Sequence, residues 1–123
     1  MLMLSVSVNA TEVTLSYTLP IIDCENNPLS PSDLGSVEIY MSDSPIPSIG
    51  ESCSNPAEPA PVGFTPVIVP AGETTVVVDL APGVYYFRAR VSTTGGLWSN
   101  LSEQTIHTVD NIQAMPPTVF IIG

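Results

Sequence analysis

The sequence predicts one all-β domain, an antiparallel β-sandwich of about seven strands. Short runs of residues alternate between apolar and polar side chains, which is typical of half-buried strands. Clusters rich in Pro, Gly and Asn separate these runs and indicate turns. The 123 residues include 13 Pro and 8 Gly, which leaves little room for long helices, and 44% of residues are hydrophobic, which is enough for a core.

Six runs are expected as strands, in chain order 4–8, 13–17, 37–41, 75–80, 85–91 and about 103–109. Successive side chains of a strand point to opposite faces of its sheet. In the third run Val37, Ile39 and Met41 are therefore expected inward, with Glu38 and Tyr40 outward. In the fifth run one face carries Tyr85, Phe87, Ala89 and Val91, and the other carries Tyr86, Arg88 and Arg90.

The segment 45–70 has a different composition, because it holds seven of the prolines, at positions 45, 47, 56, 59, 61, 66 and 70. Proline cannot donate a hydrogen bond to a strand ladder. We therefore expect an edge segment or a long loop here, and not a central strand. Such a segment either protects a sheet edge from aggregation or carries function as a long loop.

The charge balance excludes several classes of partner. Twelve carboxylates face two arginines and no lysine, which gives a net charge of -10. Nucleic acids and anionic membrane surfaces are bound by Lys and Arg, so neither is expected as a partner. Membrane insertion is not expected either, since no run approaches the roughly 20 apolar residues of a membrane span. The start, MLMLSVSV, lacks a positively charged region, so no secretory signal is expected.

Catalysis, metals and cofactors are not expected. His107 is the single histidine, and no G-x-S-x-G motif accompanies it. Two cysteines and one histidine far apart make no zinc pattern. The oxygen-rich stretch 23–27 could offer some calcium ligands, but Asp and Asn at such positions are ordinarily turn formers.

Four local motifs, in the right order, resemble a fibronectin type III module. They are TEVTLSYTLP, SDLGSVEIYMSDSP, VVVDLAPGVYYFRARV and TTGGLWSN. The resemblance covers roughly residues 5–110 and implies an immunoglobulin-like sandwich over 1–110. In the third motif Leu80 fits the corner leucine, Gly83 the turn glycine, and Tyr85 the tyrosine whose hydroxyl closes the corner. Tyr17 in place of the usual tryptophan and the segment 45–70 depart from the pattern.

Modules of this kind are common in bacteriophage virion proteins, so the resemblance implies a non-enzymatic structural virion protein. Such a protein would decorate or cement the capsid, or sit on the tail or neck, after assembly in the host cytoplasm. Its partners would be other virion proteins and copies of itself. The alternative is an adhesion module that binds host-surface glycan, with Trp98 as a stacking platform. Trp98 is also open to ordinary packing in the core or a hairpin.

Two surfaces are candidate partner-binding sites. The first comprises Tyr86, Arg88 and Arg90 with Tyr40 beside them, since Tyr and Arg are favoured at protein contacts. The alternative there is cross-strand pairing of Arg88 or Arg90 with Glu38. The second is the apolar tail 111–123, in which the docking residues would be Thr118, Val119, Phe120, Ile121 and Ile122. That tail could add a strand to a neighbouring subunit, or fold back on its own sandwich.

A disulfide between Cys24 and Cys53 is implied by the resembled topology. In that topology the loop after the family's second strand and the loop after its fourth strand, which would fall within 45–70, lie at the same end of the sandwich. Cys24 falls in the first loop and Cys53 is expected in the second. A bridge would fix the proline-rich segment to the domain. Because a chain without a signal peptide folds in the reducing cytosol, two free thiols are the favoured expectation, and the bridge stays open.

Overall fold

The computed structural model describes residues 11–70, 72–110, 116, 117, 119 and 121. Within them the protein is all-β. Its elements are β1 (Thr11–Ser16), a 3-10 helix η2 (Pro31–Asp33), β2 (Leu34–Ser42), β3 (Val67–Pro70), β4 (Thr75–Leu80), β5 (Gly83–Thr93) and β6 (Thr105–Val109). The five strands predicted from residue 13 onward are confirmed, while the expected strand 4–8 lies outside the described residues. None of the described segments is a helix long and apolar enough to cross a bilayer.

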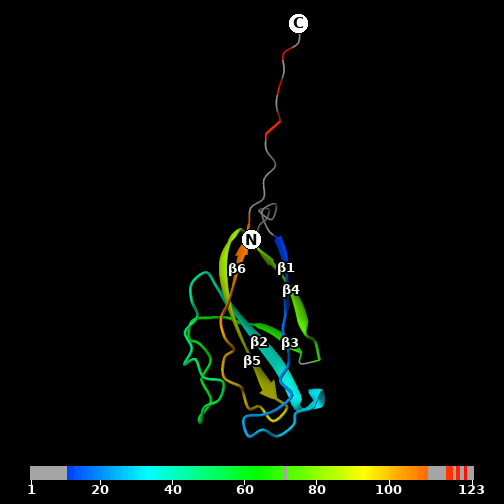
Figure 1. Cartoon of the computed structure of the whole chain (residues 1–123), viewed down its shortest axis with the longest axis vertical. Helices are drawn as coiled ribbons and strands as arrows, with labels where there is room; N and C mark the ends of the chain where they lie inside the picture. The colour runs from blue at the N-terminus through cyan, green and yellow to red at the C-terminus, as the bar shows by residue number, and fades with distance from the viewer. Residues whose placement is uncertain (1–10, 71, 111–115, 118, 120, 122–123) are drawn as a thin grey trace.

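The strands form two antiparallel sheets, as a β-sandwich requires. β1 pairs with β4 in one sheet, and the other sheet has the order β3-β2-β5-β6 (Figure 1). The main core lies between them and contains Val37, Ile39, Val69, Leu80, Phe87 and Val109. Alternation therefore predicted the inward faces of β2 and β5 correctly.

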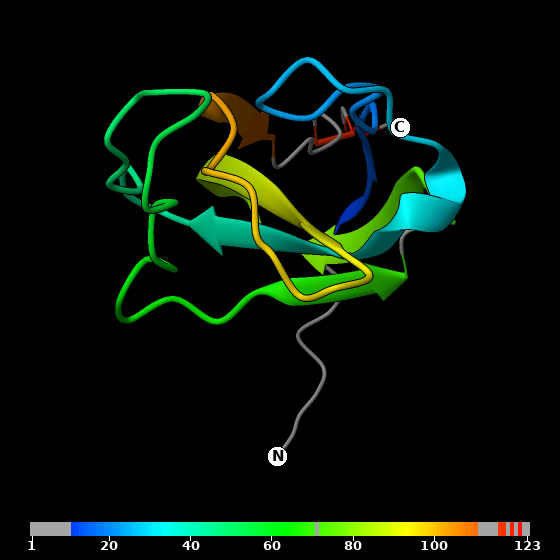
Figure 2. The same ribbon diagram turned by 90° about the horizontal axis from the view of Figure 1, so that it is seen from below.

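The proline-rich segment behaves as its composition predicts. Residues 67–70 form the edge strand β3, and residues 43–66 form a long loop between β2 and β3. In Figure 2 this loop is the green tube that continues beyond the end of the β2 arrow. It contributes Ile46 and Phe64 to a second apolar cluster, in which Tyr40 and Leu101 are also buried. The loop therefore covers part of the outer face of the four-stranded sheet.

The turn between β4 and β5 has the expected corner. The Tyr85 hydroxyl donates a hydrogen bond of 2.7 Å to the carbonyl of Ala81. Gly83 has a φ of 155°, a conformation that L side chains rarely adopt. This hydrogen bond ties the start of β5 to the chain that leaves β4, where the chain crosses from one sheet to the other.

Candidate functional site

The first predicted contact surface lies on the outer face of β2 and β5. The register of these strands pairs Glu38 with Arg90 and Tyr40 with Arg88. Paired residues share a face of an antiparallel sheet and lie close enough to interact. The sequence pattern therefore predicted correctly that these four side chains are neighbours on one face.

Arg90 is held in this face by two neighbours, Glu38 and Trp98. Its Nε and Nη2 atoms each lie 2.8 Å from Oε1 of Glu38, and its guanidinium carbon lies 4.1 Å from the centre of the Trp98 ring. The Tyr40 hydroxyl donates to the same Glu38 oxygen over 2.6 Å. Burial raises the pKa of Tyr40, and the hydrogen bond to Glu38 raises it further. The alternative of cross-strand pairing is thus confirmed for Arg90 and Glu38.

Arg88 is also occupied by the protein's own chain. Its Nε donates to the carbonyl of Ile46 over 2.7 Å, and its Nη1 donates to the carbonyl of Ser102 over 3.0 Å. These bonds attach the loop 43–66 and the segment before β6 to the middle of β5. A guanidinium suits this position because its donors have a fixed planar geometry.

The prediction that Tyr40 belongs to an exposed contact patch is therefore wrong. Its exposed fraction is 2%, because Ile46 and Leu101 pack over it, although the alternation placed it outward. Tyr86, Arg88 and Arg90 are half-buried. Alternation identifies which side of a sheet a residue faces, but not whether a distant loop covers that side. This face is a small second core.

Glu58 is central to the attachment of the loop 43–66 over this face, and the sequence analysis did not single it out. Its side chain lies in the loop 43–66, is 8% exposed, and accepts hydrogen bonds from the backbone N–H groups of Ile49 and Leu101 and the hydroxyl of Ser48. Burial acts to raise the pKa of Glu58, but the bonds from Leu101, Ile49 and Ser48 outweigh it, so the pKa is lowered. The only sequence signal was an acidic residue between prolines.

Asn100 completes the attachment of the loop. Its Oδ1 accepts the backbone N–H of Glu58 over 2.7 Å. Its Nδ2 donates to the carbonyl of Glu51 over 3.0 Å and to the hydroxyl of Ser54 over 2.9 Å. One buried amide therefore holds three points of the loop against the segment that precedes β6.

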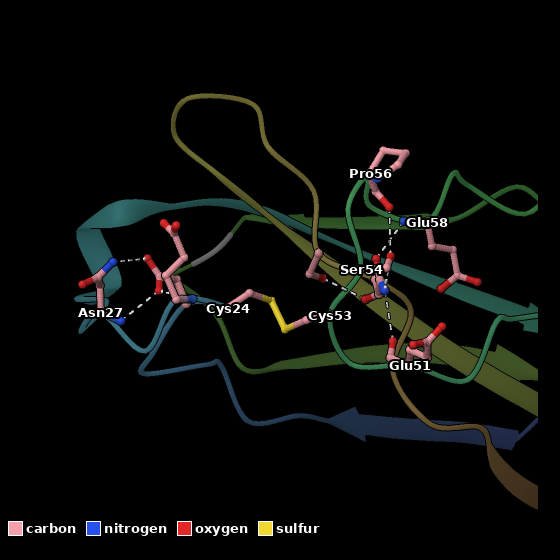
Figure 3. The surroundings of a disulfide bond; sticks show 11 residues. Cys24, Asn27, Glu51, Cys53, Ser54, Pro56 and Glu58 are labelled. Atoms are coloured by element: carbon pink, nitrogen blue, oxygen red, sulfur yellow. Dashed lines mark hydrogen bonds between the residues drawn. A yellow bond between two sulfur atoms is a disulfide. The ribbon is translucent and has the colours of Figure 1, made fainter.

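Cys24 and Cys53 form a disulfide, with their Cα atoms 5.9 Å apart, so the expectation of two free thiols is wrong. Figure 3 shows the bridge, with Glu51, Ser54 and Glu58 on the same loop as Cys53. Cys53 lies between β2 and β3, ahead of the strand it was expected to follow. The argument from a reducing compartment did not account for the closeness that the loop imposes. The bridge joins the loop 43–66 to the one after β1.

The oxygen-rich stretch after β1 is a hydrogen-bonded turn. Oδ1 of Asp23 accepts the N–H groups of Glu25 and Asn27, and Asn26 has a φ of 66°. The backbone bonds from Asn27 and Glu25 lower the pKa of Asp23. Among the described residues no group of three or more His, Cys, Asp or Glu side chains is placed to hold a metal ion.

The described part of the second contact surface is exposed. Val119 and Ile121 have exposed fractions of 82% and 97%, and neither belongs to a strand. These two side chains therefore do not pack on their own sandwich. Thr118, Phe120 and Ile122 lie outside the described residues. His107 lies on β6, paired with Tyr85, and is exposed.

No family model, curated protein or solved structure matches the chain.

We expect the disulfide to stabilise the fold by on the order of 3–4 kcal/mol in the chain-entropy model, because it closes a loop across a sequence separation of 29 residues. Urea unfolding with and without dithiothreitol measures this. The double variant Cys24→Ser, Cys53→Ser is the control, and its stability should not respond to the reductant. Equal stability of the native chain in both conditions would contradict the role of the bridge.

Replacing the buried carboxylate should also destabilise the protein. Glu58→Gln should lower the free energy of unfolding at pH 7 by about 2 kcal/mol, since hydrogen bonds to a charged group are lost. The pKa of Glu58 is lowered by folding, so its contribution is complete above its unfolded pKa of about 4.3 and is lost as the pH falls through the folded value.

Urea unfolding between pH 3 and pH 7 checks this. The two proteins should converge at the acid end. Glu51→Gln, an exposed carboxylate of the same loop, is the matched control and should resemble the native chain throughout. A constant difference between Glu58→Gln and the native chain at every pH would contradict the assignment.

Proposed function

We propose that the chain is a fibronectin type III-like, non-enzymatic structural module of a bacteriophage virion, which acts through protein–protein contacts. The family and the virion setting rest on the motif resemblance. The order of the two sheets and the Tyr85 corner support the family, because both accord with an immunoglobulin-like sandwich. Fold alone does not assign function, which depends on the side chains that the surface offers for contact.

The exposed apolar side chains beyond β6 carry the proposal. Val119 and Ile121 are almost fully exposed, and the stretch 116–123 contains no charged residue. Apolar side chains exposed in this way favour burial against another molecule. Two residues apart, they would lie on one face of an extended segment, as in strand addition to a partner's sheet.

The folded part of the chain offers little electrostatic attraction to compete with this contact. Arg90 is paired with Glu38, and Arg88 is bonded to backbone carbonyls. A protein of net charge -10 repels its own copies at long range. Association between copies therefore has to come from short-range apolar contact, which salt would strengthen by screening that repulsion.

The glycan-binding alternative receives no support from the position of Trp98. The Arg90 guanidinium stacks on one face of its ring. A sugar would therefore have only the opposite face for stacking. Trp98 therefore packs against Arg90, and a packing role was the alternative to glycan stacking that the sequence left open.

We expect the full chain to run as an oligomer of the 13.0 kDa subunit in light scattering after size exclusion. The double variant Val119→Asp, Ile121→Asp should be a folded monomer, because these side chains are exposed on the single chain and the substitutions leave its core intact. Thr74→Asp, Thr94→Asp adds the same charge at exposed turn positions and should stay oligomeric. Equal masses for the native chain and the Val119, Ile121 variant would contradict the proposal.

A further inference from the structure

Part of the outer face of the four-stranded sheet stays exposed beside the loop 43–66. The register pairs Val84 with Thr108 and Tyr86 with Ile106, and both pairs lie on this outer face. The exposed fractions of Val84 and Ile106 are 44% and 59%, while Tyr86 is half-buried against the second apolar cluster. We call these four residues the β5–β6 patch. It continues the second cluster out to the solvent.

The β5–β6 patch lies at the end of the sandwich from which the tail leaves. Val84 is the second residue of β5, and Thr108 is the last but one of β6. Figure 1 shows the described tail residues beyond the tip of the β6 arrow. Within the described residues, β6 is hydrogen-bonded along one edge only, to β5. An extended segment added to the other edge would lay its side chains beside Ile106.

The described tail residues do not cover the patch of their own chain. Val119 and Ile121 are almost fully exposed, and Val84 and Ile106 are exposed as well. Both surfaces therefore leave apolar area in water, at a cost in free energy that grows with that area. A contact between the tail of one copy and the patch of another would bury both surfaces. The chain thus carries the two halves of a self-complementary contact.

The distribution of charge favours a second copy at this place. Two copies of net charge -10 repel each other wherever their carboxylates meet. The stretches 83–87 and 105–109, which carry the patch, contain no Asp, Glu or Arg, and neither does the tail 111–123. Contact between patch and tail therefore removes no carboxylate from water. Val77 of β4 is exposed to a similar extent, but the next pair in its ladder on the same face is Glu12 with Asp79.

We infer that the β5–β6 patch is the docking site for Val119 and Ile121 of a second copy of the chain. This docking rests on the proposed function, because it supplies the surface that receives the exposed tail. Val119 and Ile121 share one face of an extended segment, so both can contact the patch together. Tyr86, one of the residues predicted to bind a partner, adds the exposed part of its ring to the contact.

The test measures the mass of full-chain variants by light scattering after size exclusion. Ile106→Asp should convert the oligomer to a monomer, because its carboxylate would be buried against the tail of the second copy. Ile68→Asp is the matched control. Ile68 is 66% exposed on the same outer face, at the opposite edge of the sheet, and this variant should stay oligomeric.

Thr108→Asp is a smaller change that also adds a charge to the patch. It should be monomeric too, and it keeps the test decisive if Ile106→Asp does not fold. Urea midpoints show which variants fold. If folded patch variants remain oligomeric, or if Ile68→Asp is as monomeric as Ile106→Asp, the inference is wrong.

Mixing the variants tests whether tail and patch contact each other directly. The Ile106→Asp chain keeps its tail, and the Val119→Asp, Ile121→Asp chain keeps its patch, so an equimolar mixture should recover a dimer. A mixture that stays monomeric would overturn the inference. If the tail variant alone loses the oligomer, the proposed function stands and only the docking site is wrong. If the native chain is itself a monomer, both proposals fail.

Discussion

The buried carboxylate of Glu58 is the interaction on which the outer face of the four-stranded sheet depends. It bonds to the backbone N–H groups of Ile49 and Leu101, and so joins the proline-rich loop to the segment before β6. A buried charge is costly unless such bonds compensate it. With them in place the loop lies over Tyr40 and Leu101, and the sheet has apolar packing on both faces. Asn100 and the disulfide reinforce the same attachment.

Because the loop 43–66 covers part of this face of the four-stranded sheet, that part is not free to bind another molecule. The two arginines serve the inside of the domain, where Arg90 neutralises Glu38 and Arg88 bonds to carbonyls of the covering loop and of the segment before β6. The surface is consequently acidic, and its apolar positions are scattered over loops and edges, as with Ile21 and Leu97. Residues beyond β6 concentrate two of the most exposed apolar side chains. We propose that contact with another protein would use that segment.

Much of the fold could be predicted from local pattern, since period-two alternation reports directly on half-buried strands. The inward set of β5 and the pairing of Glu38 with Arg90 followed from it. The burial of Tyr40 and the role of Glu58 could not be predicted, because they depend on contacts across long sequence separations. The sequence favoured two free thiols because only the reducing compartment was considered. The loop 43–66 brings the Cα atoms of Cys24 and Cys53 to 5.9 Å, which local sequence does not reveal.

Amide hydrogen exchange of Ile49 and Leu101 in the native chain tests the central role of Glu58 most directly. Ile49 donates its N–H to Glu58 over 2.8 Å and Leu101 over 3.0 Å, and neither amide lies in a strand. If the carboxylate holds the loop, both amides are protected by factors comparable to those of the β2 and β5 strands. Exchange at the rate of an unstructured peptide for these two residues, with the strands still protected, would contradict the account.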